Sequence, residues 1–249
     1  MNTSGETSRK HAAPDYFVTT RWTVVVNAGR STTLQSEKAL EELCRIYWYP
    51  LYAYVRRQRH SKEDAEDLTQ AFFERFLQKN YLDGLSSERG KFRAFLLASL
   101  KNFLANEWDK AQRQKRGEGA EHLSLDWESA DQRYHLDPAD PSTSEKLFDR
   151  EWALALLETV ISNVREECAT EGKTELFNHS KSFLMVGDNS VSYVEAAQRA
   201  GMEEGTLRVA VHRLRKRYRQ LLRDVIAQTL ADPAGVEEEL RSLQAALSS

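Results

Sequence analysis

The spacing of the apolar residues is the feature that most constrains the fold, because they recur every three or four positions along most of the chain. Leu40, Leu43, Ile46 and Tyr47 show this spacing, and strand-like alternation is scarce. Only 11 Gly and 5 Pro occur among 249 residues, so few breaks interrupt the pattern. Apolar residues at this period form one face of an α-helix. We therefore predict an all-α protein.

Several classes of protein are disfavoured by composition. The two cysteines, Cys44 and Cys168, lack CxxC spacing and a nearby histidine cluster, so we expect no disulfide framework, no metal site and no cofactor. No apolar run approaches the roughly 18 residues of a membrane span. Residues 1–17 lack the apolar stretch of a signal peptide, and we interpret them as a disordered tail. These features together predict a cytoplasmic protein without membrane insertion.

An acidic segment divides the chain into two helical blocks. Residues 117–145 hold eight acids, one base (Arg133) and two prolines (Pro138 and Pro141), and show no helical period. We interpret the segment as an extended acidic linker with no packed element. It joins two small helical domains at residues 18–116 and 146–232, followed by a short amphipathic helix at residues 233–249. That last helix could pack on the second domain or bind a regulator, and the sequence favours neither.

The first domain contains four expected helices. A short one is capped by Thr19 or Thr20, and Pro50 kinks or interrupts the second, at residues 36–60. Ser61 caps the third, whose inward arc comprises Ala65, Leu68, Phe72 and Phe76 and whose opposite arc comprises Glu63, Asp67, Gln70 and Glu74. The fourth, residues 89–116, carries eight bases against two acids. Its inward arc comprises Phe92, Phe95, Leu96, Ser99, Leu100 and Phe103.

The second domain ends in a helix-turn-helix pattern. Ser192 and Glu195 have capping-box spacing, and Gly201 stands where a glycine ends a helix. From Thr206 a second helix begins, in which residues 206–223 hold seven bases and no acid. A charged run is usually a solvated helix face, but here no acids compensate it. Its apolar stripe steps by 4, 3, 4 and 3 through Leu207, Val211, Leu214, Tyr218 and Leu221. Such a helix can enter the DNA major groove.

Both blocks resemble regions of bacterial sigma factors. The run DAEDLTQ at residues 64–70, followed by Phe72-Phe73 and Phe76-Leu77, resembles the conserved second region. Residues 89–116 resemble the promoter-melting helix of that region. Residues 192–222 resemble the fourth region. The order of regions, with no third domain, is that of the extracytoplasmic-function group. The stretch TTRWTVVV and the tail VEEELRSLQAAL resemble a variant subgroup with long linkers.

The resemblance implies a non-enzymatic DNA-binding function without catalytic residues. It implies two partners, promoter DNA and core RNA polymerase, with docking on the clamp helices and the flap of the polymerase. The residues implied for the clamp helices are Glu63, Asp67, Gln70 and Glu74. Those implied for the minus-10 element are Arg93, Lys101, Asn102, Asn106, Trp108 and Arg113. Those implied for the minus-35 element are Thr206, Arg208, His212, Arg213, Arg215, Lys216 and Arg217.

Two other functions were weighed. A stand-alone helix-turn-helix regulator would need no polymerase-docking face and would bind duplex DNA by itself. A metal-dependent nuclease would have to use Glu63, Asp64, Glu66 and Asp67, but neighbouring carboxylates on one helix point in different directions. The sequence favours the sigma factor over both. It leaves open whether an anti-sigma factor, phosphorylation or the tail controls activity.

Overall fold

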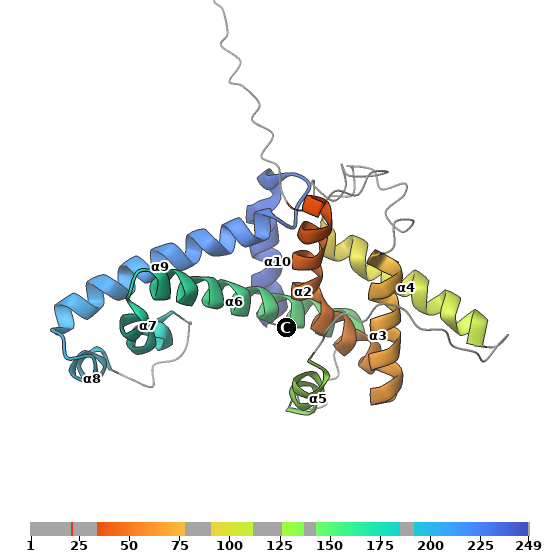
Figure 1. The fold of residues 1–249 in the computed structure, drawn as a ribbon, viewed down its shortest axis with the longest axis horizontal. Helices are drawn as coiled ribbons and strands as arrows, with labels where there is room; N and C mark the ends of the chain where they lie inside the picture. Colours follow the sequence, from red (N-terminus) through yellow and green to blue (C-terminus); the bar gives the residue numbers. More distant parts are fainter. Residues whose placement is uncertain are drawn as a thin grey trace, which may run out of the picture.

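The computed structural model describes Arg21 and residues 34–77, 91–111, 126–136, 143–184 and 192–248 (Figure 1). Every regular element within these residues is a helix. The fold class predicted from the sequence is therefore confirmed. None of the described helices is long and apolar enough to cross a membrane. In chain order they are α2 (Leu34–Arg57), α3 (Lys62–Leu77), α4 (Phe92–Ala111), α5 (Trp127–Leu136), α6 (Ser144–Thr170), α7 (Thr174–Ser180), α8 (Tyr193–Arg199), α9 (Glu204–Ala227) and α10 (Val236–Ser248), with short 3-10 helices η1 (Lys181–Phe183) and η2 (Pro233–Gly235).

The second and third expected helices form, with one difference. Helix α2 continues through Pro50, so of the two expected effects the interruption is wrong and the kink stays a prediction. Ser61 caps α3 as predicted, because its Oγ accepts a hydrogen bond from the Asp64 backbone N–H at 3.0 Å. The inward arc of α3 is buried apart from the half-buried Leu68. Of the short helix expected near Thr19 and Thr20, only Arg21 lies within the described residues.

The whole predicted inward arc of α4 is buried. Its aromatic members join those of α3, since the Phe76 ring centroid lies 5.9 Å from that of Phe95 and the Phe72 centroid 5.7 Å from that of Phe103. The start of α4 is tied to a distant part of the chain, because the Phe92 backbone N–H donates to the Thr229 carbonyl oxygen at 3.0 Å. The chain just beyond α9 therefore fixes the beginning of α4.

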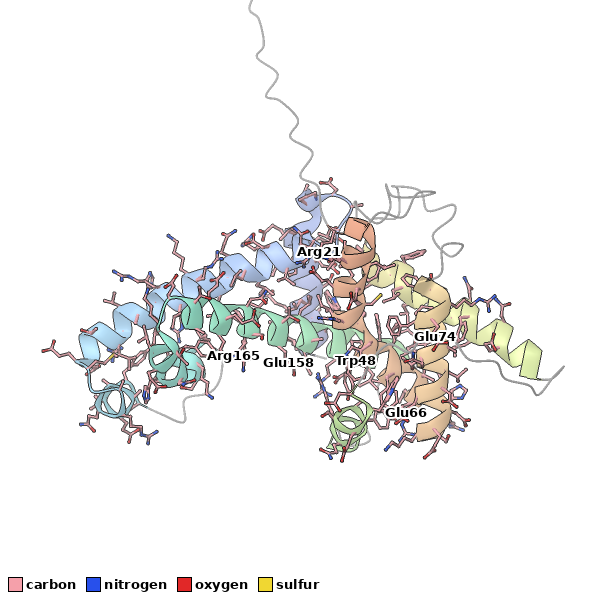
Figure 2. The ribbon with its side chains drawn as sticks, viewed as in Figure 1. Arg21, Trp48, Glu66, Glu74, Glu158 and Arg165 are labelled. Carbon is pink, nitrogen blue, oxygen red and sulfur yellow. The ribbon has the colours of Figure 1, made fainter. Side chains whose placement is uncertain are left out.

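One part of the predicted linker is a packed helix. Helix α5 lies against α2, with the Trp127 ring centroid 5.7 Å from that of Trp48 and Ala130 buried (Figure 2 labels Trp48). Arg133 bridges to Glu151 of α6 at 2.8 Å and lies 4.2 Å above the Tyr49 ring. The prediction that residues 117–145 hold no packed element is therefore wrong for residues 127–136. The residue composition misled because these contacts come from two other helices.

Packing in the C-terminal half divides at α9. Helix α6, the later part of α9, and α10 share one buried cluster with α2 to α5. The early part of α9 packs instead with η1 and α8 in a small second cluster of Phe183, Ala196, Ala197, Leu207 and Val211. In Figure 1 α7 and α8 lie at one end of the molecule, and α3 and α4 at the other. The long α6 and α9 connect the two ends.

Candidate nucleic-acid interface

The two helices that the sequence predicts, joined by a tight turn, are present as α8 and α9. Ser192 Oγ accepts from the Glu195 N–H, and a Glu195 carboxylate oxygen accepts from the Ser192 N–H, which completes the capping box. After α8, Gly201 takes a φ of +63°, a conformation that costs little only for a residue without Cβ. Helix α9 then begins at Glu204, two residues earlier than expected, so Thr206 lies in its first turn.

One face of α9 carries exposed side chains that form no hydrogen bond or ion pair with any described residue. The members follow the helical spacing 3, 3, 1 and 3 and include the exposed Val209, which was not among the predicted contact residues. The neighbouring cations dominate the sequence pattern at this point, so Val209 is recognised only from its 52% exposure in the structure. We name this set the α9 open face: Thr206, Val209, His212, Arg213 and Lys216.

The other predicted minus-35 residues are held by neighbours. Arg208 pairs with Glu204 at 2.6 Å and lies 4.3 Å above the Tyr193 ring. Arg215 Nε donates to the Phe183 carbonyl oxygen at 2.8 Å, and Arg217 Nε donates to Glu167 of α6 at 2.7 Å. The hydrogen bond from Arg217 lowers the pKa of Glu167. These three arginines therefore fix how α9 sits against α6, η1 and α8.

The acidic face predicted on α3 is present. Glu63 and Asp67 are exposed, while Gln70 and Glu74 are half-buried. Gln70 Nε2 donates to Glu74 Oε1 at 3.0 Å, which orders the later part of the face (Figure 2 labels Glu74). No group of His, Cys, Asp and Glu that could hold a metal ion is found within the described ranges.

The predicted minus-10 residues lie in contrasting surroundings. Asn102 and Asn106 are exposed on α4. The side chain of Trp108, and Arg113 as a whole, lie outside the described residues. Lys101 Nζ pairs with Glu145 of α6 at 2.7 Å, and this hydrogen bond raises the pKa of the ammonium group.

Arg93 is not available to DNA in this conformation. Its side chain is 16% exposed and its Nε donates to Glu239 of α10 at 2.6 Å. A second ion pair joins it to Asp149 of α6, and its guanidinium lies 4.3 Å above the Trp152 ring. The acidic partners of Arg93 lie 56 and 146 positions away, so its local sequence indicates only a surface cation.

Residues 47–114, from the middle of α2 to just beyond α4, match the family described as sigma-70 region 2. The chain contains a sigma-70 region 2 domain. Such a domain supports a role in promoter recognition and melting, with core RNA polymerase and promoter DNA as partners. Sigma factors are non-enzymatic initiation factors, so the expectation that this chain is not an enzyme agrees with the match.

The match covers the α3 acidic face and the described part of α4, and it ends before α5. Neither the curated proteins nor the solved structures include one that matches this chain. The helix-turn-helix therefore rests on its own geometry.

Proposed function

We propose that this protein is a sigma factor of the extracytoplasmic-function type, in the variant subgroup with a long acidic linker, acting in the cytoplasm. Its sigma-70 region 2 domain would bind the minus-10 element, and its helix-turn-helix would bind the minus-35 element. The observation that carries the proposal is a second candidate DNA-binding element, the α9 open face, at the end of the molecule away from α4. A sigma factor without a third domain needs two such elements.

Within the α9 open face, the side chains suit base recognition in a major groove. Arg213 and Lys216 can donate to guanine O6 and N7, and Thr206 can bond either a donor or an acceptor. Val209 can contact the methyl group of thymine, which is the apolar feature of that groove. Arg208, Arg215 and Arg217 are already held by protein groups, so we assign them to positioning and phosphate contact.

The α3 acidic face supports docking on a basic partner. We assign Glu63, Asp67, Gln70 and Glu74 to the clamp helices of the polymerase, and the second domain to its flap. Asn102 and Asn106 of α4 stay candidates for the minus-10 element, because exposed amides can pair with the edges of unstacked bases. An anti-sigma factor would be a further partner, and no contact among the described residues bears on it.

Run-off transcription from a promoter library tests the proposal, with purified protein plus bacterial core RNA polymerase and core enzyme alone as the control. We expect protein-dependent starts that share two sequence elements. The absence of starts, together with no binding to core enzyme, would refute the sigma function. Specific binding to duplex DNA without polymerase would then favour a stand-alone regulator.

A matched pair of valines sharpens the test of the open face. Val209→Ala removes the proposed methyl contact, and Val194→Ala removes a valine of similar exposure, 49%, on α8. Each thymine of the selected minus-35 element is replaced by deoxyuridine, which lacks only the methyl group. We expect one replacement to weaken the wild type and V194A but to leave V209A unchanged. Equal sensitivity in V209A would remove Val209 from the base contacts.

A further inference from the structure

The cations at the start of α4 are occupied by acids from the C-terminal half of the chain. Glu239 of α10 joins two of them, because its Oε1 lies 2.6 Å from Arg93 Nε and its Oε2 lies 3.0 Å from Lys91 Nζ. Glu238 also pairs with Lys91, at 2.7 Å, and Asp149 of α6 pairs with Arg93. Two cations therefore face three carboxylates. We name this set the α4–α10 cluster.

The helix dipole alone does not explain the acids of α10 in the α4–α10 cluster. Acids in the first turn of a helix are common because the helix dipole favours them. Glu239, however, is 1% exposed, and a buried carboxylate is tolerated only when it is paired. The backbone of Lys91, which pairs with Glu239, is also held in place, since Lys91 forms an isolated antiparallel bridge with Leu230. The cluster therefore places α10 at one defined position against the start of α4.

Under the proposed function, the carboxylates of the α4–α10 cluster pair with cations that would otherwise hold DNA phosphates. A strand that follows α4 would be held at its phosphates by Lys91, Arg93 and Lys101, since phosphate contacts to Lys and Arg dominate such binding. In this structure all three already pair with protein carboxylates, Lys101 through Glu145 of α6. The net charge of the cluster is one negative, which repels DNA rather than attracting it. Acids and DNA cannot occupy these cations together.

We propose that this conformation is a closed state in which α10 and the start of α6 compete with promoter DNA for the α4 cations. The proposal rests on the proposed function, because it takes α4 to be a DNA-binding helix. Binding to core polymerase and promoter releases the α4–α10 cluster, and α10 is the segment that must move. The partner of the uncovered surface is the sugar-phosphate backbone of the opened promoter strand.

Charge-neutralising variants of α10 test the competition without polymerase. Glu238→Gln, alone and with Glu239→Gln, weakens the cluster. Glu237→Gln is the matched control, because Glu237 lies on the same turn and pairs with Arg223 of α9 rather than with α4. Binding of full-length protein to a forked promoter-length DNA is measured by fluorescence anisotropy. Thermal unfolding verifies that each variant folds.

We expect E238Q to bind the fork roughly two- to fivefold more tightly than E237Q, as loss of one exposed ion pair allows. The double variant should bind more tightly still. Equal affinities for E238Q, the double variant and E237Q would overturn the proposal. If E239Q destabilises the fold, the comparison of E238Q with E237Q still decides it.

A distance measurement tests the opening itself. Spin labels are placed on the exposed Ala94 of α4 and Ala245 of α10, and the native Cys44 and Cys168 are buried. We expect one short distance in the free protein and a longer one in the complex with core polymerase and promoter. An unchanged distance in an active complex overturns the closed state and leaves the sigma function standing. Absence of any active complex counts against the proposed function instead.

Discussion

The Tyr47 hydroxyl is one of the groups that join the region 2 domain to the C-terminal half, and its removal tests how firmly they are joined. Tyr47 of α2 and Trp152 of α6 are both fully buried, and Trp152 Nε1 donates to the Tyr47 hydroxyl at 3.1 Å. Burial raises the pKa of Tyr47 far above its usual value, so the hydroxyl keeps its proton at all relevant pH values.

Tyr47→Phe removes that oxygen and leaves the buried Trp152 N–H without its acceptor. A buried donor that loses its partner costs about 1–3 kcal/mol. In a chain of this size each kcal/mol lowers Tm by about 2–4 °C. We therefore expect a fall of roughly 2–12 °C for the whole protein, in one transition, since both helices belong to one buried cluster.

Urea unfolding followed by circular dichroism, in a double-mutant cycle with Trp152→Phe, isolates the hydrogen bond. The cation–π contact of Arg93 with the ring at position 152 changes equally in both arms of the cycle, so this change cancels. We expect a coupling energy of about 1 kcal/mol. Tyr218→Phe on α9 is the control, because Tyr218 is half-buried and its hydroxyl forms no hydrogen bond with a described residue. Two separate transitions would refute the single cluster, and additive effects of the two substitutions would refute the contribution of the hydrogen bond.

Three further predictions concern other parts of the chain. Gly201→Ala should destabilise the helix-turn-helix by about 1 kcal/mol in urea unfolding, because a φ of +63° disfavours a residue with a Cβ. Gly205→Ala should stabilise it by up to about 1 kcal/mol, because Gly205 lies in α9 and an added Cβ there meets no neighbour. Asp67→Lys should weaken binding to core polymerase at least tenfold in a pull-down titration, and Glu166→Lys on α6 should not. The hydrogen bond from Lys91 lowers the pKa of Glu238 below its ordinary 4.5. The contribution of Glu238 to the stability of the α4–α10 cluster is therefore complete above pH 4.5 and is lost as the pH falls through the lowered pKa. A lengthening distance between labels on α4 and α10 would reveal this loss.

The local parts of the fold could be predicted from the sequence. The buried arcs of α3 and α4 follow from apolar spacing, and the turn between α8 and α9 follows from Ser192, Glu195 and Gly201. Each of these signals depends on residues no more than a few positions apart. Short-range spacing and capping rules are sufficient to read them.

The partners of the charged residues could not be predicted. Arg93 and Glu239 lie 146 positions apart, and nothing in the local sequence of either residue indicates the other. Helix α5 was missed for the same reason, because Trp127 and Arg133 gain their stabilising contacts from α2 and α6. Val209 was not predicted as a contact residue, because the sequence shows the charges of its neighbours but not the exposure of its own side chain. In each case tertiary contact, rather than local propensity, determined the outcome.

The two candidate DNA-binding surfaces are in opposite states, and this difference predicts an order of events. The α9 open face is uncovered, whereas the start of α4 is covered by the α4–α10 cluster. The helix-turn-helix should therefore be able to contact duplex DNA while the cluster is intact. Engagement of the minus-10 strand should require the cluster to break.

Distance measurements on the complex with core polymerase can separate the two steps. Duplex DNA that carries only the minus-35 element should bind without changing the distance between labels on Ala94 and Ala245. Forked DNA that carries only the minus-10 element should lengthen it, and should bind more tightly in E238Q than in E237Q. If the minus-35 duplex alone lengthens the distance to the same extent, the covering of α4 is coupled to α9. The later part of α9, which packs with α6 and α10 in the same buried cluster, would then be the element that transmits the change.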